Sequence, residues 1–253
     1  MRKNFKFLLI TPSYNRPYML RACIMNALNQ KYTNFHHSIV INQDADRSYD
    51  YKCLYDDLIP TSKNISPRMK EPPSPEKYII SYKANGDQHD NYIAAIVQAK
   101  ANKELYDSID YIVKWDDDDI MKSFYLSSIN DFINMHPDYN IYSTKVSNQL
   151  NNYHLNTGQS YSNLGAMNEP VGYPATIVFD KRAAEMILLT PESDGYWDFR
   201  GGGFEDTAWV HYWSKNGLKF KLNETPNDNY VWHIHGGKVA GQGNVSVSDW
   251  VAD

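Results

Sequence analysis

Four consecutive aspartates occupy positions 116–119 of the 253-residue chain. Carboxylates packed this closely repel one another, so a folded protein keeps them together when a cation lies among them or water screens them. The preceding segment alternates Ile109, Tyr111, Val113 and Trp115, a pattern typical of a buried strand. Carboxylates at the carboxyl end of an α/β strand lie where such sheets bind ligands, and hard oxygen ligands suit Mg²⁺ or Mn²⁺ holding a diphosphate. A solvated acidic loop is the alternative interpretation.

A further group of carboxylates, Glu205 and Asp206, lies just after three glycines near the start of a predicted helix. Three glycines allow the backbone to approach a ligand closely, whereas acids in the first helical turn can simply complement the macrodipole. His233 and His235 occupy alternate positions beside a glycine pair. Because imidazole is a common metal ligand, one of the two is a candidate, with His235 preferred over His233 and a structural role as the alternative.

The elements that must position these residues alternate in the first half of the chain. Predicted strands occupy 5–11, 37–42, 78–82 and 109–115, and predicted helices occupy 18–30, 49–58 and 86–103. Strands and helices joined by short connections form βαβ units, which argue for a parallel sheet. The five prolines between 60 and 75 predict a loop.

Predicted elements become shorter in the second half. An amphipathic segment covers 120–133, predicted strands occupy 141–146, 175–179, 220–222 and 230–233, and predicted helices occupy 181–189 and 204–215. A polar, Asn-rich loop is expected from 147 to 168. Trp197 is a candidate for stacking on a sugar, whereas the i, i+4 spacing of Trp209 and Trp213 favours a core role.

Composition excludes several classes of protein. A net charge of −5 argues against a general polyanion binder, and Cys23 and Cys53 are too few for a disulfide scaffold and match no metal-ligand spacing. The N-terminal apolar run is too short for a signal peptide, and nothing approaches the roughly 18 apolar residues of a membrane span. A cytoplasmic location, or a peripheral one at the inner face of a membrane, is therefore expected.

Three motifs in this order resemble those of family 2 glycosyltransferases with the GT-A fold. Residues 11–17, Thr-Pro-Ser-Tyr-Asn-Arg-Pro, resemble the family's opening motif, the aspartate run (116–119) its DxD motif, and 203–206, Gly-Phe-Glu-Asp, its later acidic motif. The resemblance extends over essentially the whole chain. It implies a single α/β domain over 1–253 with the GT-A (Rossmann-like nucleotide-diphospho-sugar transferase) fold, a mostly parallel central sheet and helices on both faces. Residues 1–120 would bind the nucleotide sugar, and 121–253 would bind the acceptor and supply catalysis.

The resemblance places the nucleotide at the ends of the first three strands. Its base and ribose would contact Thr11, Pro12, Ser13, Tyr14, Asn15 and Arg16. Arginine at the end of this motif can also reach a phosphate bidentately. The family usually carries an aspartate at or near position 42, so the base contact falls to Asn42, Asp44 or Asp46, and Asn85 partially matches an Asn-x-Gly element. Plain turns are the alternative for 11–16 and for Asn85.

The same resemblance assigns roles to the carboxylates. Asp118 would contact the metal directly, and Asp116 would meet the ribose, or the metal through water. Asp117 belongs to the same donor-binding motif, and Asp119 would cap the following helix or reach the sugar. His235 or His233 would complete the metal site, since several GT-A enzymes use a late histidine in this way.

The implied function is inverting, metal-dependent transfer of a hexose or pentose from a nucleotide-diphosphate donor to an acceptor hydroxyl. The expected donor is a UDP-sugar, and the expected metal is Mn²⁺ or Mg²⁺. In such transfer one carboxylate deprotonates the acceptor, which favours Asp206 as base, with Glu205 as the alternative.

The implied acceptor is a surface glycan or lipopolysaccharide, with a modified DNA base as a phage-type alternative. Binding DNA would call on a local basic patch formed by Lys63, Arg68, Lys70 and Lys77, but a solvated loop explains these residues as well.

Two other classes of protein remain as alternatives. A nucleotidyltransferase would carry a glycine-rich phosphate loop after the first strand, and residues 11–17 contain no glycine. A non-catalytic module that binds carbohydrate or a metal would tolerate the loss of Glu205 and Asp206, because a fold alone never guarantees activity.

Overall fold

The computed structural model describes residues 2–14, 16–42, 77–83, 88–144, 148–151, 176–189, 205–224 and 230–234. The predicted helix at 49–58 and the predicted loop at 60–75 lie outside these residues. No described helix combines the length and apolarity that crossing a membrane requires.

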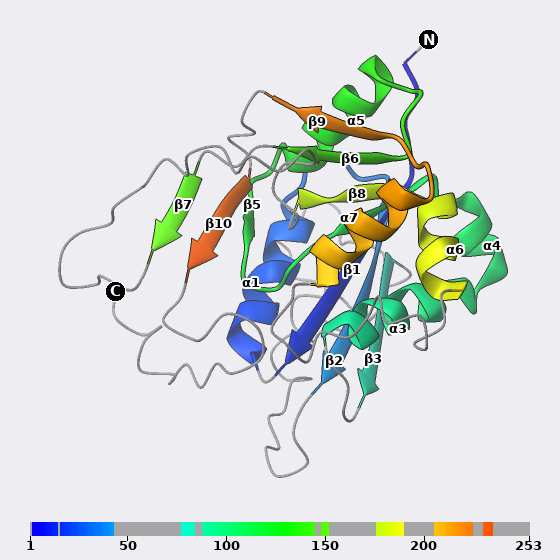
Figure 1. Cartoon of the computed structure of the whole chain (residues 1–253). Helices are drawn as coiled ribbons and strands as arrows, with labels where there is room; N and C mark the ends of the chain where they lie inside the picture. Colours follow the sequence, from blue (N-terminus) through cyan, green and yellow to red (C-terminus); the bar gives the residue numbers. More distant parts are fainter. Residues whose placement is uncertain are drawn as a thin grey trace.

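A seven-stranded sheet lies at the centre of the described chain, in the order β3-β2-β1-β4-β8-β6-β9 (Figure 1). Its strands are β1 (Phe7–Tyr14), β2 (Phe35–Asn42), β3 (Tyr78–Lys83), β4 (Tyr111–Lys114), β6 (Ile141–Thr144), β8 (Val178–Asp180) and β9 (Phe220–Asn223). Strand β8 runs antiparallel to both of its neighbours, and the other pairings are parallel. The predicted α/β class with a mostly parallel sheet is therefore confirmed.

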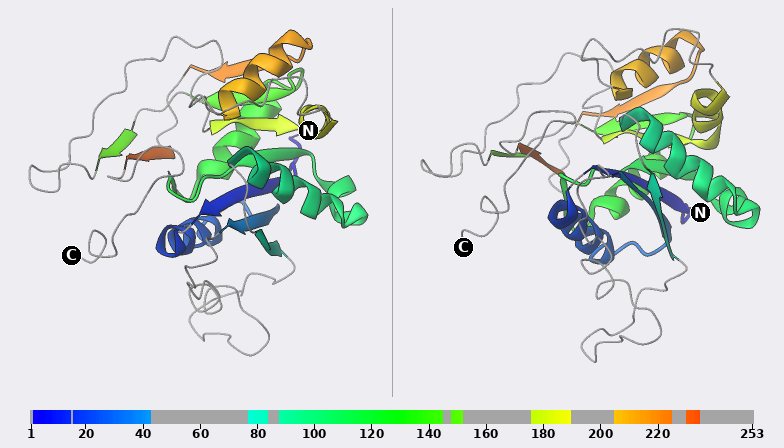
Figure 2. Two further views of the ribbon diagram at one scale, coloured as in Figure 1. Left: turned by 60° about the horizontal axis from the view of Figure 1, so that its bottom comes forward. Right: turned by 90° about the horizontal axis from the view of Figure 1, so that it is seen from below.

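Helices cover both faces of this sheet (Figure 2). One face packs against α3 (Gln88–Lys100), α4 (Lys103–Ser108), α6 (Lys181–Leu189) and α7 (Glu205–Lys215), and the other packs against α1 (Pro17–Leu28) and α5 (Tyr125–Met135). Strand β1 directs Leu8 and Ile10 into the hydrophobic cluster under α3, α4, α6 and α7, and Phe7 and Leu9 into the cluster under α1 and α5. Because both faces are covered, the strand is a continuous apolar run rather than an alternating one.

Two predicted elements differ from the observed ones. The predicted helix 86–103 is α3, which ends at Lys100, and a second helix, α4, follows where no helix was predicted. Asn102 caps α4 by accepting a hydrogen bond from the Leu105 amide at 3.0 Å. The loop predicted from 147 to 168 contains strand β7 (Asn148–Asn151), so that prediction was wrong there. Strand β7 joins β10 (Tyr230–Ile234) and β5 (Ile120–Met121) in a second sheet, of order β5-β10-β7. The polar sequence of β7, Asn-Gln-Leu-Asn, has no strand pattern of its own. The strand forms through backbone pairing with β10.

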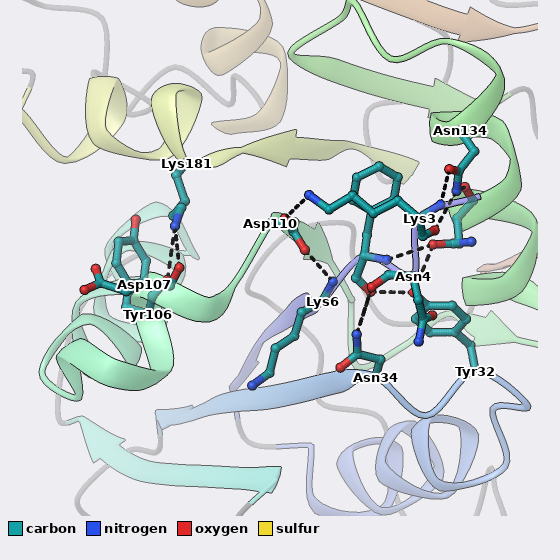
Figure 3. A network of polar contacts seen from close by, with 12 residues as sticks. Lys3, Asn4, Lys6, Tyr32, Asn34, Tyr106, Asp107, Asp110, Asn134 and Lys181 are labelled. Atoms are coloured by element: carbon teal, nitrogen blue, oxygen red, sulfur yellow. Dashed lines mark hydrogen bonds and ion pairs between the residues drawn. The ribbon is translucent and has the colours of Figure 1, made fainter. Parts of the chain in front are cut away.

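Polar contacts fix the end of the sheet at which β1 begins (Figure 3). Asp110 accepts hydrogen bonds from the Lys6 amide and from Lys3 Nζ, each at 2.8 Å. Asn134 exchanges two hydrogen bonds of 2.8 Å with the backbone of Lys3. These contacts tie the start of β1 to the residue before β4 and to α5, so they help to set the register of the two strands that lead to the candidate site.

Candidate functional site

The candidate site lies at the carboxyl ends of β1 and β4. The chain runs from β1 outward to β2 and β3, then crosses back to β4 on the other side of β1, so the strand order reverses between β1 and β4. Sheets of this kind bind ligands at such a switch point. The Trp115 amide donates to the Ile10 carbonyl at 3.1 Å, and Thr11 Oγ1 donates to the Trp115 carbonyl at 2.5 Å. These two bonds fix the point at which the aspartate run leaves the sheet.

Arg16 pairs with two members of the aspartate run. Its Nη1 donates to Asp117 Oδ1 at 3.1 Å and to Asp118 Oδ2 at 2.7 Å. Burial lowers the pKa of the guanidinium, but the two carboxylates outweigh that effect and hold the pKa above its ordinary value. Arg16 is therefore a permanent cation among the aspartates.

Asp117 is a buried member of the run, with a side chain only 4% exposed. Burial raises the pKa of Asp117 to about 6; the Arg16 charge opposes that rise, and the Asp118 charge adds to it. Ser13, itself 1% exposed, lies beside this carboxyl group and favours its ionised form. Asp117 thus interacts with the Arg16 charge and with Ser13 at the end of β1.

Both carboxylate oxygens of Asp116 accept hydrogen bonds from buried donors. The Tyr92 hydroxyl donates to Oδ1, and Lys114 Nζ donates to Oδ2 at 2.9 Å. Lys114 Nζ also lies 5.2 Å from the centroid of the Tyr92 ring. Burial raises the pKa of Asp116, and the Lys114 charge is the main influence that opposes this rise. Tyr92 and Lys114 therefore orient the carboxylate and favour its charged form.

Three members of the run fit a divalent cation. Asp116, Asp118 and Asp119 each offer one carboxylate oxygen, and these atoms lie within 4.8 Å of one another. Several carboxylate oxygens converging on one point are a donor set for Mg²⁺ or Mn²⁺. Arg16 and Lys114 offset two of the four negative charges, and a divalent cation would offset the other two. The structure thus brings Asp116 and Asp119 together with Asp118, the residue predicted to contact the metal.

The opening motif is divided between β1 and the turn that follows it. Thr11, Pro12, Ser13 and Tyr14 form the second half of β1, and Arg16 directly precedes α1. Asn42 ends β2 and is 2% exposed. The predicted contacts of these residues with a nucleotide stay predictions, and Asn15, Asp44, Asp46 and Asn85 lie outside the described residues.

Thr11 has a role inside the sheet. Because its hydroxyl hydrogen goes to the Trp115 carbonyl, Thr11 Oγ1 accepts at 2.8 Å from His37 Nε2, which must therefore carry the imidazole hydrogen. His37 is fully buried, and burial lowers its pKa to about 3. This neutral histidine on β2 is joined through Thr11 to the base of the aspartate run.

The predicted catalytic carboxylates, Glu205 and Asp206, form the first turn of α7. Helix α7 contacts the site through Trp209, one helical turn further on. The Trp209 ring packs edge-on against Tyr92 at 5.4 Å between centroids, and its Nε1 donates to His89 Nδ1 at 3.0 Å. Tyr92, which donates to Asp116, thus also contacts the helix that carries the predicted base.

The other late candidates are two tryptophans of α7 and two histidines in or directly after β10. Trp209 and Trp213 are fully buried, which confirms their predicted core role. His233 lies in β10 opposite Leu150 of β7, but its side chain is outside the described part of the structure, as is the whole of His235. Metal binding by either histidine stays a prediction.

Sequence reasoning missed Tyr92, Lys114 and His37. Lys114 had a visible indication, since it ends an apolar strand and lies two residues before Asp116, on the same side of an extended chain. His37 likewise begins the apolar stretch 37–42. Tyr92 is one of 20 tyrosines, and nothing in the local sequence distinguishes it.

Comparisons with known proteins agree with this architecture. No family model and no curated protein matches the sequence. Among solved structures, TarS 1-349 from S. aureus matches 90% of this chain and 60% of its own, with a TM-score of 0.58 and 14% identity. Its complex with UDP-GlcNAc matches 92% of this chain and 60% of its own (TM-score 0.59, 13% identity), and its complex with UDP matches 91% and 61% (TM-score 0.55, 14% identity).

This chain spans about three fifths of the TarS 1-349 chains that it matches. At such low identity the likeness shows the fold alone. The chain has the GT-A-like fold that the motifs predicted, and membership of family 2 stays a prediction.

Proposed function

We propose that this protein is a glycosyltransferase that uses a nucleotide-diphosphate sugar. One observation carries the proposal: a partly buried arginine and three convergent carboxylates meet at the switch point of a glycosyltransferase-like sheet. The solved complexes of TarS, which shares the fold, contain UDP and UDP-GlcNAc. A UDP-sugar is accordingly the proposed donor.

Asp116, Asp118 and Asp119 are the proposed holders of Mn²⁺ or Mg²⁺, with His235 or His233 as a further ligand. A bound divalent cation neutralises the charge that develops on a diphosphate leaving group. Tyr92 and Lys114 keep Asp116 in place, and the hydrogen bonds of Thr11 and Trp115 fix where the run begins. Residues 11–16, Asn42, Asp44 and Asn85 would surround the nucleotide.

The proposed reaction proceeds with inversion, by direct attack of the acceptor hydroxyl on the donor sugar. Asp206, or Glu205 in its place, takes the proton from that hydroxyl. The contact between Trp209 and Tyr92 supports this role, because it packs the helix that begins with these acids against a residue that binds Asp116. In this proposal residues 1–120 bind the donor, and 121–253 bind a glycan acceptor and supply the base.

Thermal unfolding in the presence of nucleotides tests this proposal directly. A ligand well above its Kd stabilises the folded protein by a few kcal/mol, so UDP with Mn²⁺ should raise Tm visibly. The Asp118→Asn variant should lose the part of the shift that depends on Mn²⁺. If none of the nucleoside diphosphates shifts Tm, with or without Mn²⁺, the proposed donor class is wrong.

A further inference from the structure

Arg16 occupies a position in which two functions compete for one carboxylate. A single guanidinium nitrogen, Nη1, lies 2.7 Å from Asp118 Oδ2 and 3.1 Å from Asp117 Oδ1. Asp118 is one of the three carboxylates that converge as a candidate cation site, whereas Asp117 is outside that group. Arg16 therefore pairs both with a candidate metal ligand and with a carboxylate that remains available to it when a metal is bound.

Arg16 and Asp118 are both more exposed than Asp117. Arg16 and Asp118 are 16% and 25% exposed, so both reach the surface of the site, while Asp117 is 4% exposed. A guanidinium hydrogen-bonded to Asp118 places a positive charge beside the point where a divalent cation would bind. The guanidinium and the cation would therefore repel each other strongly in a partly buried site. The pairing of Arg16 with Asp118 and the binding of a cation by Asp118 thus oppose each other.

The fold also provides a second partner for the guanidinium. Arg16 directly precedes α1 at the switch point, where an α/β sheet binds its ligand. A guanidinium presents several N–H donors in a planar fork that matches phosphate oxygens. An arginine that leaves Asp118 while keeping Asp117 can therefore direct the rest of its fork at a bound diphosphate.

We propose that Arg16 is an exchangeable counter-ion, which pairs with Asp118 in the metal-free protein and transfers to the donor diphosphate when a divalent cation is bound. Asp117 retains the side chain during the exchange. This inference rests on the proposed function and deepens it, because it predicts that cation and nucleotide bind cooperatively through one residue. A purely structural ion pair would instead give Arg16 no part in this cooperativity.

The test is a titration of the full chain with Mn²⁺ alone, with free Mn²⁺ measured by electron paramagnetic resonance. The Arg16→Gln variant should bind Mn²⁺ about tenfold more tightly than the wild type, because the competing charge is gone. The same variant should bind UDP more weakly when Mn²⁺ saturates the site. The charge-matched control Arg182→Gln, at an exposed position on α6, should change neither affinity.

Opposite changes in the two affinities support the exchange, and equal or weaker binding of Mn²⁺ alone by Arg16→Gln overturns it. The Arg16→Lys variant guards against a folding defect, since it keeps the charge and should bind Mn²⁺ with an affinity between those of the wild type and Arg16→Gln. Failure of the proposed function has a different signature: the wild type itself would bind no UDP in the presence of Mn²⁺. If the wild type binds UDP with Mn²⁺ but Arg16→Gln leaves both affinities unchanged, only the exchange is wrong.

Discussion

Lys114 and Asp116 form an ion pair of 2.9 Å at the end of a central strand, with side chains only 2% and 11% exposed. Burying such a pair costs free energy, and removing one partner costs far more, because the other partner is left as an unpaired buried charge. Here Asp116 is also one of the three convergent carboxylates. The presence of the pair is explained by the candidate site to which Asp116 belongs, since the core of the sheet alone would be served equally well by apolar residues.

Replacement of Lys114 by methionine should therefore destabilise the protein strongly. The substitution removes one of the two described donors to Asp116 and leaves the Tyr92 hydroxyl as the other, so Asp116 becomes a buried charge without its cation. Breaking such a pair costs about 3–5 kcal/mol. Urea unfolding of Lys114→Met, Asp116→Asn and the double variant measures the coupling. The double variant should be more stable than Lys114→Met alone; strictly additive losses would contradict the assigned pairing.

Replacement of Tyr92 by phenylalanine should separate binding from packing. The ring keeps its contact with Trp209, and only the hydroxyl that donates to Asp116 is lost. A hydrogen bond to a charged group is worth about 1.5–3 kcal/mol, so we expect Mn²⁺-dependent UDP binding to weaken by at least about tenfold. Isothermal titration calorimetry measures this affinity.

The matched control for Tyr92→Phe is Tyr106→Phe. Tyr106 donates its hydroxyl to Glu185 at 3.2 Å, in a contact that involves no member of the aspartate run. This control should leave UDP binding unchanged. Equal weakening by both variants would mean that the loss arises from general destabilisation rather than from the orientation of Asp116.

The proposed base is tested by comparing Asp206→Asn with Glu205→Gln. Removal of a general base costs about 10²–10⁴-fold in rate, and Asp206→Asn should lose this much in kcat while retaining Mn²⁺-dependent UDP binding. Glu205→Gln should lose less. Sugar transfer is followed with radiolabelled donor, and UDP affinity is followed in parallel. A larger loss of kcat in Glu205→Gln would exchange the two roles, and full activity in both variants would exclude this helix as the source of the base.

The parts of the site that could be predicted are those that lie at the ends of strands. The apolar run before the aspartates identified β4, and the turn after the first apolar run placed Arg16 at the same edge of the sheet, because parallel strands end together. Both inferences need only local sequence and the rule of parallel topology. The pairing of Arg16 with Asp117 and Asp118, about a hundred residues away, follows once β1 and β4 are neighbours.

The parts that escaped prediction depend on packing between distant segments. Tyr92 donates to Asp116 only because α3 lies across the sheet against β1 and β2, and no local pattern indicates that the tyrosine of α3 makes this contact. Strand β7 likewise exists through its pairing with β10, some 80 residues later. Lys114 is intermediate between these cases, since a charge at the end of an apolar strand indicates a buried partner without identifying it.

His37 gives a prediction about pH that does not depend on the metal. Its imidazole donates from Nε2 to Thr11, so a second proton would have to bind Nδ1, which is buried and has no partner among the described residues. Burial lowers the pKa of His37 to about 3, below its ordinary value of 6.5. Between these two values the unfolded chain binds the extra proton and the folded chain does not, so stability rises with pH and falls as pH drops below 6.5.

The free energy of unfolding of the wild type should therefore decrease relative to that of His37→Gln by about 1.4 kcal/mol for each pH unit below 6.5. Glutamine keeps a donor for Thr11 but does not titrate, and the carboxylates common to both proteins cancel in the difference. Urea unfolding at several pH values between about 6.5 and about 4.5 measures this slope. His211→Gln, which replaces an exposed histidine of α7 and retains His37, provides the control and should keep the loss of stability that His37 causes below pH 6.5. A wild-type stability that stays parallel to that of His37→Gln over this range would mean that the folded protein accepts the second proton, and that the contact between His37 and Thr11 rearranges to accommodate it.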